Sequence, residues 1–350
     1  MKNYYKSLFV ALFVFSVSFY SSAQQPMNLD LPSPLNTGHY IPGIFSLRDL
    51  ATPPATGLYV LDYNMYLKSD KYFNKNGDEV KSITGPLGFQ TNLSLDVKGY
   101  ANVLSLIYAK KTKILGNAVF LFALTPVYTT VNPNLAYQRI GLIDTLQLSG
   151  NVNAEVSGFG DIRVMPLFLS WHSDQFDFTA GYDFFAPTGR YEKGASDNVG
   201  LGYWSHLIQA FGYYYPLKIK GKPSQAMALM LSGSYEMNSK IKGVDVTPGS
   251  RFTVEYGISQ YLSEQLELTV MGGNNFQVGE DSGNDVWWDK SVKDKIGFAS
   301  FQIGYWPWKD RLYTSAKYSL SYGEKQRLNM NILQLNLTYV TGLLGDRKIK

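Results

Sequence analysis

The sequence predicts an all-β fold, an antiparallel transmembrane β-barrel of about 12 strands preceded by an irregular N-terminal segment. Three observations predict it: a secretory signal over residues 1–23, the absence of cysteine, and many segments in which apolar and polar residues alternate with a period of two. No stretch after Ala23 approaches the roughly 18 apolar residues of a spanning helix. If the chain crosses a membrane, it must therefore cross with strands.

The signal begins with basic residues, continues as an apolar stretch from Leu8 to Tyr20, and ends on small residues before Gln24, where we expect cleavage. Because no cysteine follows, a lipoprotein anchor and a disulfide scaffold are both excluded. The formal charge of the whole chain is +4, and its basic residues are scattered. Nucleic acid is therefore not an expected partner.

Residues 24–56 form no obvious strand and are rich in proline. This composition favours a solvated linker. Apolar residues in the same segment favour burial instead, as a plug that folds from the periplasm up into the barrel lumen. These residues are Ile41, Ile44, Phe45, Leu47 and Leu50. Both interpretations remain open at the level of sequence.

The barrel is expected over residues 57–341. In its first strand Tyr59, Leu61 and Tyr63 alternate with Asp62 and Asn64. The expected strands, in order, are 57–69, 91–109, 118–131, 159–172, 175–187, 203–216, 226–239, 250–261, 266–277, 296–306, 311–323 and 329–341.

The connections between these strands alternate in length. Tight turns are expected at 110–117, 173–174, 217–225, 263–265 and 307–310. Longer polar or glycine-rich stretches occur at 70–90, 132–158, 188–202, 240–249 and 278–295, followed by a short one at 324–328. Barrels of the outer membrane have long loops outside and tight turns in the periplasm. The pattern therefore predicts an outer-membrane location with both termini, including a tail at 342–350, in the periplasm.

Aromatic residues concentrate near the expected strand ends, where amphipathic rings prefer the level of the lipid headgroups. They include Trp171, Tyr203, Trp204, Tyr213, Tyr214, Tyr215, Trp306 and Trp308. The same rings would also suit the core of a soluble β-sandwich. The signal and the sorted loop lengths favour the barrel.

If the apolar-rich phase of each strand faces lipid, a mixed set of side chains faces the lumen. Its polar members are Asp62, Asn64, Asp96, Lys98, Asn102, Asp177, Asp183, Arg251 and Glu255, and its less polar members are Tyr66, Tyr100, Met165, Leu167, Leu169 and Phe185. Charges of both signs inside a barrel can simply pair with one another. Apolar residues on the lumen wall indicate a path for poorly soluble molecules.

Several motifs resemble those of a known family. They include Gly38-His39-Tyr40-Ile41-Pro42-Gly43, Phe185-Ala186-Pro187-Thr188-Gly189-Arg190-Tyr191 and Gly194-Ala195-Ser196-Asp197-Asn198. The chain resembles, over roughly residues 38–341, the phenol meta-pathway degradation family of SphA-type outer-membrane transporters. This resemblance implies a channel that admits hydrophobic compounds, and it brings no catalytic residues.

Enzymatic and metal chemistry find little support. The histidines after the signal are His39, His172 and His206, and adjacent strand residues such as Ser205 and His206 point to opposite faces. The acid-rich loop at 280–285 lacks the ordered ligand spacing of a calcium loop. We therefore expect no catalytic residue, metal or cofactor.

The predicted function is passive uptake of small hydrophobic compounds, with aromatic compounds as one option. The substrate would pass Trp287 and Trp288, which either pack against a neighbouring loop or gather an aromatic ligand, then the loop carrying Arg190, and leave near His39 and Arg48. A non-transporting structural or surface-interaction barrel is the alternative, and an outer-membrane lipid enzyme acting through His172 or His206 is a third. Expected partners are the bilayer, lipopolysaccharide, small hydrophobic solutes and the barrel-assembly machinery.

Overall fold

The computed structural model describes residues 33, 35, 38–50, 53, 56–84, 90–140, 148–217 and 227–341. The expected signal at 1–23, the first residues after it and the expected tail at 342–350 lie outside this description. Within it, no helix is long and apolar enough to cross a membrane. The helical element η1 (Leu47–Leu50) is a single 3₁₀ turn.

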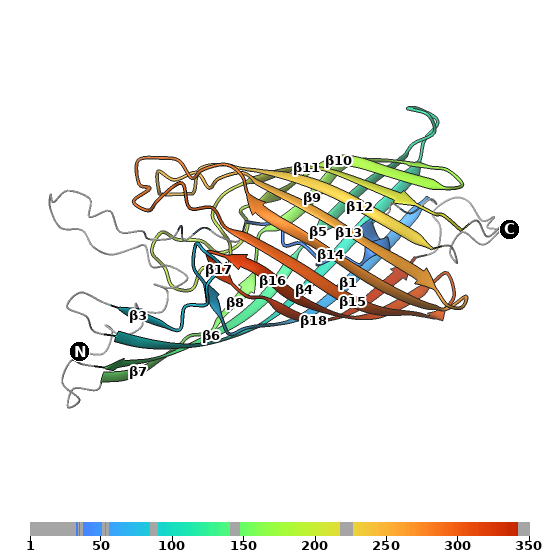
Figure 1. Ribbon diagram of the computed structural model, residues 1–350. Helices are drawn as coiled ribbons and strands as arrows, with labels where there is room; N and C mark the ends of the chain where they lie inside the picture. Colours follow the sequence, from blue (N-terminus) through green and yellow to red (C-terminus); the bar gives the residue numbers. More distant parts are fainter. Residues whose placement is uncertain are drawn as a thin grey trace.

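Twelve antiparallel strands close into a barrel (Figure 1). The strand β1 (Gly57–Ser69) pairs on one edge with β18 (Asn331–Val340) and on the other with β4 (Gln90–Lys111), and this double pairing closes the ring. The remaining strands of the ring are β5 (Val119–Thr125), β9 (Ile162–His172), β10 (Phe176–Ala186), β11 (Ser205–Tyr214), β12 (Ala228–Asn238), β13 (Arg251–Tyr261), β14 (Leu266–Gln277), β15 (Lys295–Trp308) and β16 (Leu312–Lys325). The predicted fold class is confirmed.

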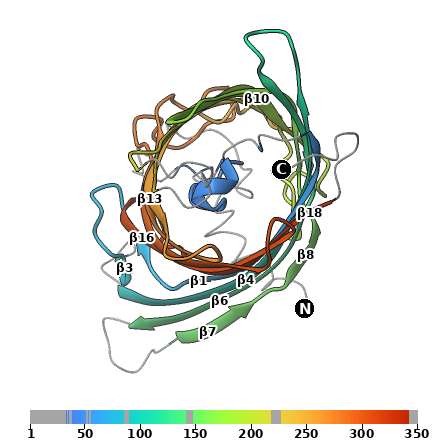
Figure 2. The ribbon, with the colours of Figure 1, turned by 90° about the vertical axis from the view of Figure 1, so that its right-hand side faces the viewer.

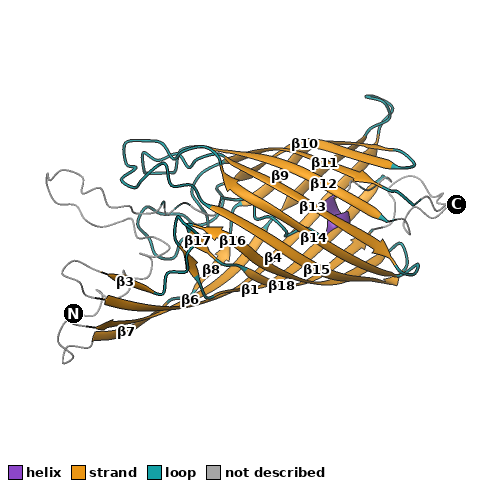
Figure 3. Ribbon diagram, in the orientation of Figure 1, coloured by secondary structure: helices purple, strands orange, loops and turns teal. Residues whose placement is uncertain are grey.

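The expected loop at 132–158 is in fact largely strand. Here β6 (Val127–Ile140) continues β5 beyond Pro126, and it pairs with β4, β7 (Leu148–Asn153) and β8 (Val156–Phe159). Proline cannot donate a ladder hydrogen bond, which explains the break between β5 and β6. Together with β3 (Ser82–Thr84), these strands form a sheet that extends past the rim of the barrel (Figures 1 and 3). The prediction missed it because its Asn, Gly and Ser residues are typical of loops.

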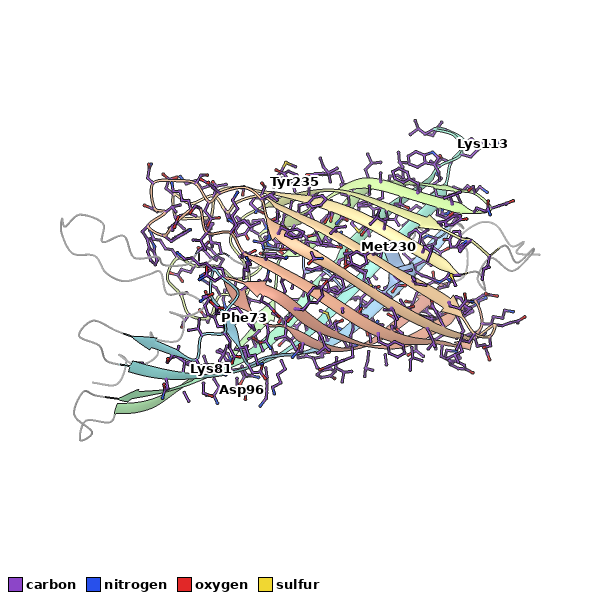
Figure 4. All side chains as sticks on the ribbon, viewed as in Figure 1. Phe73, Lys81, Asp96, Lys113, Met230 and Tyr235 are labelled. Carbon is purple, nitrogen blue, oxygen red and sulfur yellow. The ribbon has the colours of Figure 1, made fainter. Side chains whose placement is uncertain are left out.

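Two further short strands lie in expected loops: β2 (Tyr72–Phe73) pairs with β17 (Arg327–Leu328). Within the wall, alternate side chains face outward or inward. On β12, for example, Met230 is buried inside the barrel whereas Tyr235 is 39% exposed on the outer surface (Figure 4). Large exposed apolar side chains cover the outer face of most strands, as a lipid-facing wall requires.

Residues 38–50 of the N-terminal segment lie inside the barrel. Viewed down the axis, η1 occupies the middle of the ring (Figure 2). Ser33 contacts Asp281 in the long connection between β14 and β15, whereas β1 starts at the tight-turn end of the barrel. The described part of this segment therefore runs from the long-loop end to the tight-turn end. From the start of β1, the described residues thus extend up the lumen toward the long loops.

Candidate functional site

Residues 38–50, which we call the lumen segment, form the candidate site together with the inner barrel wall. The described residues of the segment share no strand ladder with the wall and are held mainly by side-chain hydrogen bonds. Several of its apolar side chains pack into the main buried cluster with inward residues of the strands. The segment is therefore attached to the inner wall through contacts that can be broken without unpairing any strand.

At the long-loop end, His39 anchors the segment. Its Nδ1 lies 2.6 Å from Ser205 Oγ, and its Nε2 lies 2.9 Å from Asp161 Oδ2. The ring stacks on Phe185 at a centroid distance of 4.9 Å. Burial by itself raises the pKa of Asp161, but hydrogen bonds from His39 and from the Leu201 N–H outweigh it and leave the pKa below its usual value. Asp161 is thus an ionised anchor for His39.

Ser205, His39 and Asp161 are the residue types of a catalytic triad, brought together from three distant parts of the chain. Ser205 is fully buried, and its hydroxyl donates to Asn238 Oδ1 at 2.5 Å. A nucleophile needs a free approach for the substrate carbon, which this packing denies. The arrangement in this structure is suited to anchoring. The prediction missed this cluster because it weighed His206 beside Ser205, and His206 lies on the outer face against Tyr182.

Backbone N–H groups of the lumen segment are bound by carboxylates of the wall. The N–H groups of His39 and Tyr40 donate to Glu236 at 3.0 and 3.3 Å. Farther down, the N–H of Gly43 and the hydroxyl of Tyr40 donate to the two oxygens of Glu255, at 2.7 and 2.5 Å. Charged acceptors make stronger hydrogen bonds than neutral ones. These two glutamates, both buried, therefore fix the half of the lumen segment that lies nearer the long loops.

The carbonyl groups of the same stretch face a buried cation. Lys317 Nζ lies 2.6, 2.9 and 3.0 Å from the carbonyl oxygens of Gly43, Ile44 and Phe45. An ammonium group has three protons, so these three acceptors satisfy it completely. Gln334 Nε2 donates to the Ile44 carbonyl as well, at 2.7 Å. The middle of the segment thus presents its N–H groups to one side of the wall and its carbonyls to another.

The end near η1 is held by a third set of contacts. Tyr213 OH donates to the Leu47 carbonyl at 2.6 Å, and Tyr63 OH donates to Asp49 at 2.8 Å. Arg48 Nε lies 2.8 Å from a carboxylate oxygen of Glu267. The side chain of Leu47 is fully buried, so this end of the segment is held by apolar packing as well as by polar bonds.

Two glycines allow the segment to pass so close to the wall. Gly38 and Gly43 have φ values of +59° and +77°, a region that other residues rarely adopt. A Cβ at Gly38 would lie 2.6 Å from Arg251, and one at Gly43 would lie 2.7 Å from the ring of Phe298. Both glycines belong to the Gly38–Gly43 motif recognised in the sequence.

The long connections form a second apolar cluster at the mouth. It consists of Tyr203, Ile241, Val246 and Trp288, with partly buried neighbours from the same connections and from Leu35. Trp288 is 7% exposed and donates to Asp281 at 2.8 Å, whereas Trp287 is 47% exposed. Trp288 therefore packs against neighbouring loops, one of the two alternatives left open above. Arg190 binds the Asp197 carbonyl within its own loop.

The expected inward orientation is wrong for β1 and β4. The inner phase of β1 contains Tyr59, Leu61, Tyr63 and Met65, which pack around the lumen segment. The alternate residues therefore face outward, and the outer face also includes Leu167 and Leu169 of β9. The outward residues of β1 and β4 that were expected to face the lumen are Asp62, Asn64, Tyr66, Asp96, Lys98, Tyr100 and Asn102. The error arose because an apolar phase was assigned to lipid, whereas here the lumen itself is apolar.

On β9, β10 and β13 several expected inward residues do face the interior. Arg251 and Glu255 are buried there, Asp183 pairs with Arg163, and Met165 packs against the main buried cluster. Asp177 accepts a hydrogen bond from Tyr215 near the tight-turn end. Among the described residues, no group of three or more His, Asp or Glu side chains is arranged to hold a metal ion.

Comparisons with known proteins bear on this site. Residues 73–337 match the model of a family described as "Putative MetA-pathway of phenol degradation". The chain belongs to this family. The match covers most of the barrel, and the resemblance stated from the sequence motifs is confirmed. No curated protein matched the chain.

Solved structures of outer-membrane proteins are similar to this member of the phenol-degradation family. An outer membrane channel from Pseudomonas putida F1 has a TM-score of 0.58 and 14% identity, over 84% of this chain and 98% of that one. A FadL homologue from Pseudomonas aeruginosa has a TM-score of 0.39 and 12% identity, over 81% and 90% of the two chains. At these identities the first likeness establishes the fold of an outer-membrane β-barrel.

Proposed function

We propose that this protein is an outer-membrane channel for passive uptake of small hydrophobic compounds, and that the lumen segment is the plug that controls it. The observation that carries the proposal is the attachment of residues 38–50 to the inner wall by side-chain hydrogen bonds around an apolar cluster. Such a segment can shift within the lumen while every strand of the barrel stays paired.

The lining supports a hydrophobic cargo rather than a hydrophilic one. Inward Leu61, Met65, Phe168, Phe211 and Met271 lie next to the segment and would line a path if it moved. A sieve for polar solutes has no need of these side chains, whereas a path for poorly soluble molecules does. Aromatic compounds are one option within this class, in keeping with the description of the family.

The proposed route begins at the mouth beside exposed Trp287 and the loop that carries Arg190. It passes His39 and the inward Asp183, Arg251 and Glu255, and it leaves beside Arg48 and Asp177. Asp62, Asn64, Asp96 and Lys98 do not belong to this route because they face outward. The membrane, lipopolysaccharide and, during biogenesis, the barrel-assembly machinery are the proposed partners. The proposed periplasmic side is the tight-turn end, where the last described residue, Thr341, bonds to Leu58.

The test is uptake of labelled phenol-like and alkane-like solutes into proteoliposomes. The full mature chain is compared with a version that lacks residues 24–50, after heat-dependent gel migration shows that both barrels are folded. We expect faster flux from the shortened chain and a preference for one solute class. If neither version carries any solute above empty liposomes, the structural or surface-interaction barrel becomes the better account.

A further inference from the structure

The outer faces of β1 and β4 carry a row of polar side chains that most of the barrel surface does not have. Asp62 and Asn64 on β1 pair across the ladder with Leu337 and Leu335 of β18, both of which are nearly half exposed. Side chains paired in this way lie side by side on one face of the sheet. The two polar residues therefore lie at the depth of lipid-facing leucines.

These side chains form a connected hydrogen-bond network. Asn102 Nδ2 donates to Asp62 at 2.6 Å, and Asn64 Nδ2 donates to the other oxygen of Asp62 at 3.1 Å. Tyr100 OH donates to Asn64 at 2.7 Å. A carboxylate on the lipid face of a barrel is unfavourable, and its occurrence indicates a specific role.

Toward the long-loop end, the outward side chains of β1 and β4 change from amides and a carboxylate to tyrosines and then to lysines. Tyr66 and Tyr100 come first, with ring centroids 5.3 Å apart, as expected at the level of the lipid headgroups. Lys68 and Lys98 follow as direct cross-strand partners. Like charges placed opposite one another repel, so this pair favours an anion between them.

Each lysine also has a carboxylate nearby: Lys98 lies 2.9 Å from Asp96, and Lys68 lies 3.4 Å from Asp70. Both lysines are more than half exposed, and ion pairs of this kind contribute little and exchange readily with other partners. An anionic group can therefore replace Asp96 and Asp70 as the partner of the two lysines.

Above the lysines, an open cavity of about 420 Å³ lies against the extended sheet. It is lined by Asp96, Lys98, Asn132, Pro133, Asn134, Ala154 and Glu155. Amide, carboxylate and ammonium groups of this kind suit the hydroxyl groups of a sugar. Figure 4 shows Asp96 on the outer surface beside this sheet.

We propose that this outer face of β1, β4 and β6 is a binding site for lipopolysaccharide of the outer leaflet. The order of groups matches that of its lipid anchor: amide and hydroxyl groups of the acyl chains at Asp62, Asn64 and Asn102, phosphate at Lys68 and Lys98, and saccharide in the cavity. The inference rests on the outer-membrane location of the proposed function, but it does not depend on transport.

The test measures lipid bound per folded barrel by native mass spectrometry of the full mature chain in detergent, with rough lipopolysaccharide and with phosphatidylglycerol as probes. K68A/K98A and N102L are each expected to weaken lipopolysaccharide binding about tenfold or more, because each removes hydrogen bonds that involve charged groups. The matched control is N274L, which changes another outward asparagine, on β14, four strands from β1 around the ring, where it bonds to Tyr322.

Three outcomes would overturn the proposal: equal binding of both lipids by the wild type, equal loss of binding in N274L, or a lipid-free dimer mass that N102L abolishes. The last would identify the face as an interface between two copies. K68A/K98A changes only exposed side chains, so it stays informative if N102L folds poorly. Because solute flux is not part of the readout, failure of the transport proposal leaves this test intact.

Discussion

Lys317 in β16 holds the carbonyl oxygen of Gly43 at 2.6 Å, across 274 residues of sequence. The cation is buried, and its remaining protons go to the next two carbonyls of the lumen segment. One side chain of the wall thus binds three consecutive residues of a segment that forms no part of the barrel ladder.

Replacing this cation releases the segment. We expect Lys317→Met to weaken its attachment by about 2 kcal/mol, since it leaves three buried carbonyls without their charged donor, and to raise the population of detached segment roughly 30-fold. Conductance of single channels in planar bilayers measures this. Lys309→Met is the control, because Lys309 bonds Glu264 at an exposed tight turn. Equal conductance of the two variants would contradict the prediction.

His39→Phe tests the anchor at the mouth. Phenylalanine keeps the stacking on Phe185 but removes the bonds to Asp161 and Ser205, so a buried carboxylate loses a partner at a cost of about 1–3 kcal/mol. We expect faster hydrogen exchange at the backbone of residues 38–43. His206→Phe, on the outer face, is the matched control and should leave this exchange unchanged.

Gly43→Ala tests the close approach of the segment to the wall. The new Cβ would meet Phe298 at 2.7 Å in a backbone conformation with φ of +77°. Gly323→Ala measures the cost of the positive φ alone, because Gly323 has φ of +62° but nothing lies within 4 Å of the new Cβ atom. We expect Gly43→Ala to lower the temperature of the heat-dependent gel shift more than Gly323→Ala, which should cost about 1 kcal/mol. Equal shifts would mean that the contact with Phe298 relaxes freely.

The lowered pKa of Asp161 predicts an acid-dependent anchor. A carboxylate whose folded pKa is depressed contributes stability above its unfolded pKa of about 3.9, and this contribution is lost as the pH falls through the folded value. Conductance of the wild type should therefore rise on acidification below about pH 4. Asp161→Asn should abolish this rise in conductance at low pH. If the variant shows the same rise as the wild type, other carboxylates cause it.

The two adjacent tryptophans should behave differently. Trp288 is buried among the long connections and bonds Asp281, so Trp288→Ala should loosen the mouth and increase protease cleavage within 240–249 and 278–294. Trp287→Ala removes an exposed ring and should leave cleavage at the wild-type rate. Similar cleavage of both variants would show that the buried cluster does not hold these loops.

The sequence predicted the barrel well because its signals are local. Alternation with a period of two requires only that one face of a strand be apolar, and turn residues mark strand ends within a few positions. The strands at 57–69 and 266–277 were predicted with the bounds that the structure has. The extended sheet around β6 and β7 was missed, because its Asn, Gly and Ser residues are typical of loops.

What the sequence determined by itself is the class of fold, the number of strands in the ring and membership of the family. What only the tertiary structure decided is which phase of each strand faces inward, because the lumen segment presents apolar side chains to β1 and a backbone N–H group to Glu255 of β13. The site depends on the same contacts: His39 meets Asp161 and Ser205, and Lys317 meets Gly43, only after the barrel closes around the segment. Each strand produces a periodic pattern of apolar and polar residues in the sequence. Contacts between residues so distant in the chain produce no such pattern, so the sequence does not predict them.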